Sequence, residues 1–181
     1  MSQFEQALHE IGSVLDRMRD DDIARGTEMI ASANTIVAYG CGRESLQIQG
    51  FVMRLYHLGL RASMQGAMTT PPLGPGDLFL CSAGPGELST VTALMRVARA
   101  AGARILFLTA EPDCDAARLA DEVLTVPAQT MARDVGGSST LPMGSVYEGA
   151  LFVLFEILVL RLRDRLGETS ESMRARHTNM E

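Results

Sequence analysis

Short apolar runs alternate with segments of helical periodicity along the middle of the chain. Five runs have the length and composition of strands: 34–40, 60–64, 77–82, 103–110 and 121–127. Three helical segments lie between them: 45–59, 89–102 and the shorter 115–120. Continuous apolar runs such as ILFL are typical of strands covered on both faces, as in a parallel sheet. The alternation predicts a three-layer α/β sandwich built on five strands.

Further elements are predicted on both sides of this core, which spans about 34–127. A helix or helix pair precedes it at 2–33, and a long apolar helix follows at about 142–167. The polar, glycine-rich segment 128–144 is expected to be a mobile loop, and 168–181 is a polar tail with a short helical pattern. Because we find no internal repeat and no second core, a single domain covering 1–181 is predicted.

The apolar stretch 144–160 could be mistaken for a membrane span. Glu148 and Glu156 interrupt it, whereas a spanning helix needs about 20 predominantly apolar residues. A helix that is apolar nearly all round is better explained by burial inside an oligomer. We therefore expect no membrane contact and a homo-oligomer, either a dimer or a tetramer.

Charge and cysteine usage narrow the function classes. The net charge of −6 lacks the basic surface that nucleic acids or anionic lipids require. The beginning of the chain shows no secretory signal pattern. The cysteines, Cys41, Cys81 and Cys114, have no metal-ligand spacing. We expect a cytoplasmic protein with free thiols, no nucleic-acid partner and no metal.

Two loops after predicted strands carry the candidate chemistry, GCGRES (40–45) and SAGPGELST (82–90). Parallel sheets bind ligands beyond the carboxyl ends of their strands, and each loop leads into a helix whose N–H groups and dipole attract an anion. One such loop could simply form a turn and cap a helix, but two on adjacent strands favour a phosphate site. The residues proposed for it are Gly40, Gly42, Arg43, Ser45, Ser82, Gly84, Gly86, Ser89 and Thr90.

A dinucleotide site is the main alternative for the first loop. Ser45 stands where the third glycine of the fingerprint would be, and the second strand lacks the acidic residue expected for ribose. Neither loop contains the lysine of a nucleotide-binding P-loop. The sequence therefore predicts no cofactor.

Several segments together resemble one family. The segments are GCGRESLQIQGFVMRLYHLG, TTPPLGPGDLFLCSAGPGELSTV, the Glu after LPMGSVY and the ending MRARHTNME. Over nearly the whole chain they are similar to the 6-phospho-3-hexuloisomerases of the sugar isomerase (SIS) superfamily. The resemblance implies a five-stranded parallel sheet in flavodoxin-like order and assembly as a tetramer. It also implies interconversion of 3-hexulose 6-phosphate and fructose 6-phosphate without a metal.

The phosphate loops depart from the family pattern. Relatives usually have G-R-S-G in the first loop, where this chain has Glu44 in place of the serine and Ser45 one position later. In place of the usual S-G-S-G-E-T, the second loop has Ala83, Pro85 and Leu88 and one more residue. A carboxylate aimed at phosphate would repel it. Either Glu44 turns away and Ser45, Ser82 and Ser89 compensate, or the ligand differs from that of the family.

Glu148 matches the family's proposed catalytic glutamate. Moving a carbonyl between neighbouring carbons requires a base that transfers a proton through a cis-enediol, and desolvation on an apolar helix raises the pKa of a carboxyl toward that task. The alternative is an exposed or ion-paired glutamate at the rim of a helix. Glu156 has no such match and is interpreted as structural.

The remaining candidates are polar residues near the loops and at the chain end. His57 could shuttle a proton or open the sugar ring, and the resemblance implies that such a histidine serves the site of a neighbouring subunit; alternatively, it simply ends a helix. His177 could reach over a site from the tail. Arg43 either polarises a sugar oxygen or pairs with Glu44, and the pair is favoured. Glu87 is included among the substrate-binding residues.

Three functions are consistent with these features. The first is isomerisation of 3-hexulose 6-phosphate with Glu148 as the base. The second is phosphosugar binding without catalysis, suggested by the altered loops. The third is isomerisation of another sugar phosphate, such as a pentose or heptose phosphate.

Overall fold

A computed structural model describes residues 1–133 and 139–180. The elements, in chain order, are α1 (Gln3–Leu15), α2 (Asp20–Ala31), β1 (Ile36–Gly40), α3 (Gly42–His57), β2 (Ala62–Met64), β3 (Leu78–Ser82), α4 (Ser89–Ala100), β4 (Arg104–Thr109), η1 (Ala116–Leu119), β5 (Glu122–Thr125), η2 (Met131–Arg133), α5 (Ser145–Leu166) and α6 (Ser170–Ala175). All five predicted strands are present, each within two residues of the predicted boundaries. The predicted loop 128–144 lies partly outside the described residues.

The five strands form one parallel sheet in the order β2-β1-β3-β4-β5. This is the flavodoxin-like order, with a switch point between β1 and β3. Gly40 at the end of β1 lies opposite Ser82 at the end of β3. The two loops singled out in the sequence therefore leave neighbouring strands at the same edge of the sheet, as predicted.

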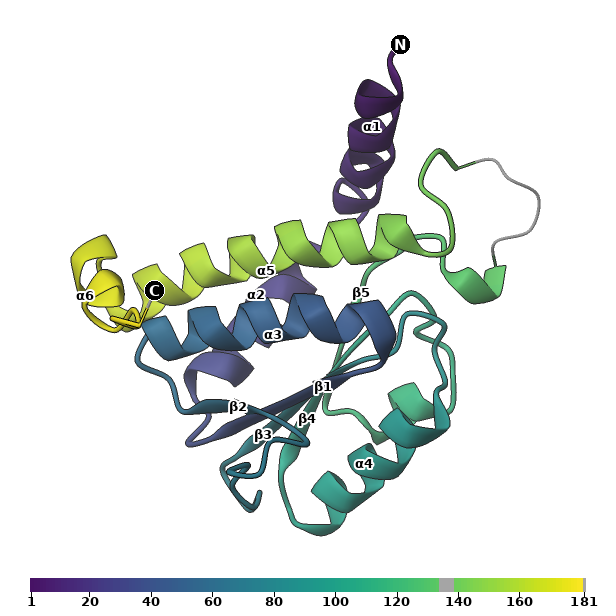
Figure 1. The fold of residues 1–181 in the computed structure, drawn as a ribbon. Coiled ribbons are helices and arrows are strands. Elements are labelled where there is room, and N and C mark those ends of the chain that lie inside the picture. Colours follow the sequence, from purple (N-terminus) through teal and green to yellow (C-terminus); the bar gives the residue numbers. More distant parts are fainter. Residues whose placement is uncertain (134–138, 181) are drawn as a thin grey trace.

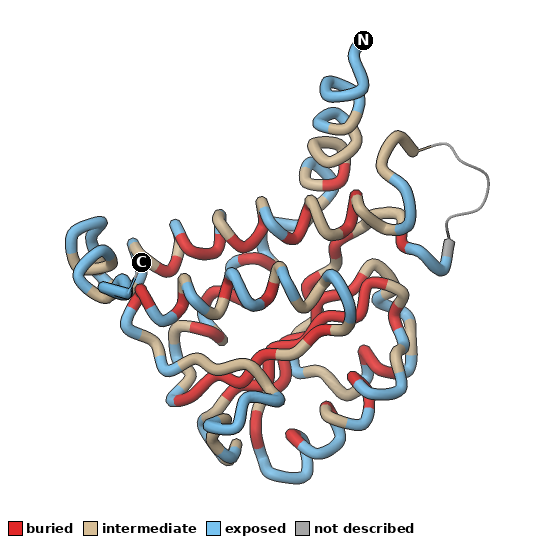
Figure 2. The backbone as a smooth tube through the Cα atoms, in the orientation of Figure 1, coloured by how far each residue is buried: buried red, intermediate tan, exposed pale blue. Residues whose placement is uncertain are grey.

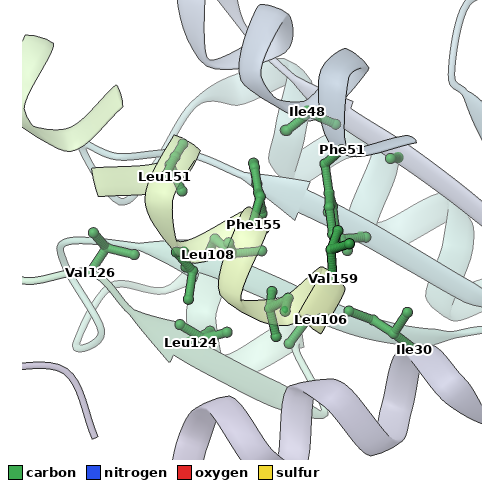
Figure 3. Packing of buried hydrophobic residues seen from close by; sticks show 14 of the residues in the cluster. Ile30, Ile48, Phe51, Leu106, Leu108, Leu124, Val126, Leu151, Phe155 and Val159 are labelled. Carbon is green, nitrogen blue, oxygen red and sulfur yellow. The ribbon is translucent and has the colours of Figure 1, made fainter. Parts of the chain in front are cut away.

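Helices cover both faces of the sheet. Alternate strand residues point to opposite sides, so that Ile36 and Leu80 join the core under α2, α3 and α5, while Val37 and Phe79 pack toward α4. The three central strands, β1, β3 and β4, are almost entirely buried in the middle of the molecule (Figures 1 and 2). On the three-helix side, Phe51 of α3 stacks on Phe155 of α5 with ring centroids 4.4 Å apart (Figure 3). Continuous apolar runs are thus explained by burial on two faces.

Helix α3 begins at Gly42, three residues earlier than its apolar periodicity predicts. Gly42 has a φ of +56°, which glycine adopts without steric cost and which lets the chain turn from β1 directly into the helix. Gly40 is equally constrained, since a Cβ there would lie 2.6 Å from Cδ1 of Ile48. The two glycines therefore place the first turn of α3 immediately against the end of the sheet.

Helix α5 crosses the outer side of the three-helix layer and brings distant parts of the chain together. Its first turn lies at the same end of the molecule as the start of α3, and its last turn lies beside α6 at the other end (Figure 1). Helix α1 projects from the body near the first turn of α5. Among the described helices, none has both the length and the apolar character needed to cross a membrane.

Candidate functional site

A pocket of about 320 Å³ opens where the start of α3, the loop after β3 and the start of α5 meet. It is lined by Cys41, Gly42, Arg43, Glu44, Gly84, Pro85, Leu88, Thr130, Met131, Met143, Gly144, Tyr147 and Glu148. These residues come from four separate segments of the chain. The pocket lies beyond the carboxyl ends of β1 and β3, which is where parallel sheets of this order bind ligands.

Glu148 faces this pocket from the first turn of α5. Its side chain is only 12% exposed, and Oε2 lies 2.6 Å from Nη2 of Arg43. The two groups form an ion pair. Burial raises the pKa of the Glu148 carboxyl above its ordinary value, and the Arg43 guanidinium partly opposes that rise. The carboxyl is therefore a desolvated base held next to a cation.

The partner of Arg43 differs from the expectation. The sequence analysis favoured a pair with Glu44, its neighbour in the chain, and that prediction was wrong. Consecutive residues at the start of a helix point in directions about 100° apart. Arg43 consequently turns toward α5, while Glu44 turns toward the loop after β3.

Glu44 occupies the donors of the second loop. Its Oε2 accepts a hydrogen bond from Ser82 Oγ at 2.5 Å, and its two oxygens lie 3.1 and 3.2 Å from the Gly84 amide nitrogen. Burial raises the pKa of this carboxyl, and these two hydrogen bonds oppose the rise. The sequence analysis offered two alternatives: Glu44 turns away from the phosphate loops, or the ligand differs from that of the family. In the structure, Glu44 does not turn away but is bonded to the second loop.

Tyr147 was missed by the sequence analysis. It is 2% exposed, and its hydroxyl lies 3.1 Å from Ser82 Oγ. Because the single proton of Ser82 is donated to Glu44, the Tyr147 hydroxyl is the donor in this contact. Burial raises the pKa of Tyr147 well above its ordinary value, which keeps that proton in place. The only sequence signal was its position one residue before Glu148.

Other predicted residues lie around the pocket rather than in its lining. Ser45 accepts a hydrogen bond from Gln49 Nε2 at 3.2 Å, one turn along α3. Glu87 and Ser89 are exposed at the start of α4. Gly86 has a φ of +94° and packs against Glu111, so it shapes the loop. Met131, the first residue of η2, and Met143 do line the pocket, and no sequence pattern indicated either of them.

His57 and His177 lie together at the opposite end of α3. Arg43 and His57 are 14 residues apart in that helix, which corresponds to about 20 Å. The two imidazole rings are 5.2 Å apart. Arg176 holds the tail there, with bonds to the His57 carbonyl at 2.8 Å and to the Glu168 carboxylate at 2.8 and 2.9 Å. Within one chain, the structure does not bring either histidine to Glu148.

This anchoring of the tail gives a testable prediction. Arg176→Ala should expose the α6 amides to hydrogen exchange, because it removes the bonds from the end of α6 to the His57 carbonyl and to Glu168. Arg174→Ala, within α6, should leave exchange unchanged. Arg176 and Ser172 lower the pKa of Glu168 to about 2. The stability from this pair is therefore present above the ordinary value of 4.5 and is lost as the pH falls toward 2. Equal protection of α6 in the two variants would contradict the prediction.

The described residues contain no cluster of three or more His, Cys, Asp or Glu side chains arranged to hold a metal ion. The three cysteines are free, and Cys81 is fully buried. The polar groups that face the pocket are therefore the two carboxylates, one guanidinium, and backbone and hydroxyl donors. Such a set can bind hydroxyl and anionic groups and can move protons.

The sequence pattern of the SIS domain family matches residues 29–152. The chain belongs to this family. It is 30% identical to a 3-hexulose-6-phosphate isomerase of Bacillus subtilis, over 96% of this chain and 93% of that protein. It is 33% identical to one of Mycobacterium gastri, over 95% of this chain and 86% of that protein.

A solved structure from Methanococcus jannaschii has the same fold. Its TM-score to this chain is 0.86, with 22% identity over the full length of both chains. That hypothetical protein was inferred from its structure to be a 3-hexulose-6-phosphate isomerase. At this identity the likeness establishes the shared architecture, a five-stranded parallel sheet with helices on both sides.

Proposed function

We propose that this SIS domain protein is a phosphosugar isomerase that interconverts 3-hexulose 6-phosphate and fructose 6-phosphate. The observation that carries the proposal is the desolvated, raised-pKa carboxyl of Glu148, which faces a pocket at the switch point of the sheet. The names of the relatives, which align over nearly the whole chain, specify the substrate.

In this mechanism, Glu148 removes the proton from C2 of the 3-ketose while the C3 carbonyl gains electron density. The resulting cis-enediol accepts the proton back at C3, and a second proton moves from O2 to O3. Arg43 lies 2.6 Å from Glu148 and so close to the reacting atoms. Its guanidinium stabilises the negative charge that develops on the enediolate oxygen.

The phosphate is assigned to the two loops at the ends of β1 and β3. Ser82 and the Gly84 amide are aimed at one point, and the N-terminal ends of α3 and α4 add favourable dipoles. Ser45, Gly86, Glu87 and Ser89 lie around this position, where we expect them to shape the loop or contact the substrate. Arg43 is expected to contact the sugar rather than the phosphate.

We also propose that the protein assembles as a dimer or tetramer. Large apolar side chains are exposed on α3 and α5, which lie side by side over one face of the sheet (Figure 1): Leu46, Met53, Tyr56, Phe152, Ile157 and Leu160. A second copy seated on this layer would cover them. It would also provide a way for His57 or His177 to serve the pocket of a neighbouring chain, since neither reaches the pocket of its own.

The assembly is tested by light scattering after size exclusion. We expect a mass of two or four times 19.5 kDa at micromolar concentration. Phe152→Asp should shift that mass toward the single chain, because it puts a charge into the apolar layer. Phe4→Asp on the projecting helix α1 is the matched control and should not. A single-chain mass for the wild type would contradict the proposal.

The activity is tested by two measurements on the wild-type protein. A coupled assay with 3-hexulose 6-phosphate should show formation of fructose 6-phosphate. A thermal-shift panel with pentose, hexose and heptose phosphates then identifies the ligands that stabilise the fold. Stabilisation by fructose 6-phosphate without turnover would instead support a non-catalytic phosphosugar-binding protein. That alternative is favoured by Glu44, which already holds the phosphate donors. Stabilisation and turnover with a different sugar phosphate would reassign the substrate.

The three cysteines are free thiols, which is the usual state of cysteines in the reducing cytoplasm. We expect the protein to act there.

A further inference from the structure

The donors assigned to the phosphate are already committed within the chain. The Tyr147 hydroxyl donates to Ser82 Oγ, Ser82 donates to Glu44, and the Gly84 amide donates to the same carboxylate. The Glu44 carboxylate is thus the final acceptor of this hydrogen-bond network. Ser82 has one hydroxyl proton and Gly84 one amide proton, so neither can serve a second anion fully at the same time.

Burial makes this competition strict. Ser82 is fully buried and Tyr147 is 2% exposed, and the Ser82 hydroxyl contacts both the Tyr147 hydroxyl and the Glu44 carboxylate. The Gly84 amide is held by the same group, since its nitrogen lies 3.1 Å from Oε1 and 3.2 Å from Oε2 of Glu44. A phosphate oxygen can take these two donors only after the carboxylate has left them.

The charge of the pocket acts in the same direction. Among the described residues that line it, the ionisable carboxyls are Glu44 and Glu148, and the one cation is Arg43, which is paired with Glu148. With Glu44 ionised, an incoming dianion meets a net negative lining. Without Glu44 the ion pair leaves the lining neutral. Burial raises the pKa of the Glu44 carboxyl, and the nearby charge of Glu148 adds to that rise.

We propose that Glu44 is an internal competitor for the anion seat, and that it sets both the affinity and the selectivity of this protein for phosphorylated ligands. The carboxylate takes the place of a phosphate oxygen on Ser82 and Gly84, and a phosphorylated ligand binds by displacing it. The inference rests on the proposed function for the location of the phosphate. It goes beyond that function by assigning to Glu44 a lowered affinity for the phosphate group.

The test is a comparison of Glu44→Ser with the wild type by titration calorimetry, using inorganic phosphate, fructose 6-phosphate and fructose. We expect Glu44→Ser to bind the two phosphorylated compounds at least 10-fold more tightly, with binding of fructose unchanged. Asp21→Ser is the control, because it also removes a carboxylate from the first turn of a helix, but one that is exposed and lies on α2, away from the pocket. It should bind all three compounds like the wild type.

A second variant covers loss of folding in the first. Glu44→Gln keeps the size of the side chain and one acceptor oxygen but removes the charge. Its affinity for inorganic phosphate should therefore lie between the affinity of the wild type and that of Glu44→Ser. Unchanged or weaker binding of inorganic phosphate by the folded variants would overturn the inference, because Glu44 would then be irrelevant to the ligand or a part of its binding site.

These measurements separate the inference from the isomerase proposal. Tighter phosphate binding by Glu44→Ser, with no turnover of 3-hexulose 6-phosphate by either protein, would support the competitor role of Glu44 and contradict the proposed isomerase activity. Turnover by the wild type, with no gain in phosphate affinity in Glu44→Ser, would contradict the competitor role and support the isomerase activity.

Discussion

Glu148→Gln should lower kcat for 3-hexulose 6-phosphate by about 10³-fold, with little change in KM. A positioned general base contributes about 10² to 10⁴ in rate, and glutamine cannot take up the proton from carbon. The amide keeps the size and polarity of the side chain, so the pocket and the fold should persist. The measurement is the coupled isomerase assay together with thermal unfolding of both proteins.

The matched control is Glu156→Gln, two turns further along α5. Its carboxylate lies 3.4 Å from Arg54 on the outside of the helix and is 41% exposed. Removing this charge takes nothing from the pocket, so kcat should stay within about twofold of the wild type, in line with the small effects of most surface substitutions. If Glu148→Gln retained wild-type turnover, Glu148 would not be the base.

The pH profile adds a readout that a purely structural role would not produce. The base works only when ionised, so kcat/KM should fall on the acid side with the pKa of Glu148, which burial raises above 4.5. Arg43 opposes that rise. Arg43→Ala should therefore move the acid limb to higher pH, because burial remains while the stabilising cation is lost. A shift to lower pH would contradict the ion pair as the relevant contact.

The location of the site could be predicted because it follows from chain order and strand chemistry. Glycine at the end of β1 and serine at the end of β3 are readable in the sequence, and parallel strands of this order bring their carboxyl ends together. Glu148 could be identified because a carboxylate within an apolar helix is unusual and because the surrounding segments resemble a known family. Each of these features can be recognised within a single segment of the sequence.

The contacts inside the site could not be predicted, because they join residues far apart in the chain. Glu44 and Ser82 are 38 positions apart, and whether the carboxylate meets the hydroxyl depends on how α3 is rotated about its axis. That rotation is fixed by the packing of Ile48 and Phe51 in the core, four and seven residues after Glu44. A helix start misplaced by three residues turns Arg43 and Glu44 toward the wrong partners.

The same packing makes the ring stack between α3 and α5 a structural determinant of the site. Phe51 and Phe155 are stacked nearly parallel at 4.4 Å, and both are almost completely buried (Figure 3). They fix α5 against α3, and these two helices carry Glu148, Arg43 and Glu44 in their first turns. A loss of packing here should therefore affect both stability and activity.

Phe155→Ala should lower the free energy of unfolding by about 3–5 kcal/mol, the usual cost of truncating a buried phenylalanine. Domains of this kind are stable by only about 5–15 kcal/mol, so the variant should unfold at much lower urea concentration. Phe4→Ala, the same truncation at a position that is 84% exposed, should change stability by less than about 0.5 kcal/mol. Both are measured by urea unfolding at one protein concentration, since assembly contributes to apparent stability.

A double-mutant cycle with Phe51→Ala isolates the contact between the rings. Each single truncation removes the stack, so the double variant should be less destabilised than the sum of the two by about 0.5–1.5 kcal/mol. Additive effects would mean that the rings are buried independently and do not couple the helices. In that case, the alignment of Glu148 with Arg43 would depend on the loops at the mouth of the pocket, and Phe155→Ala would leave kcat unchanged in the fraction that remains folded.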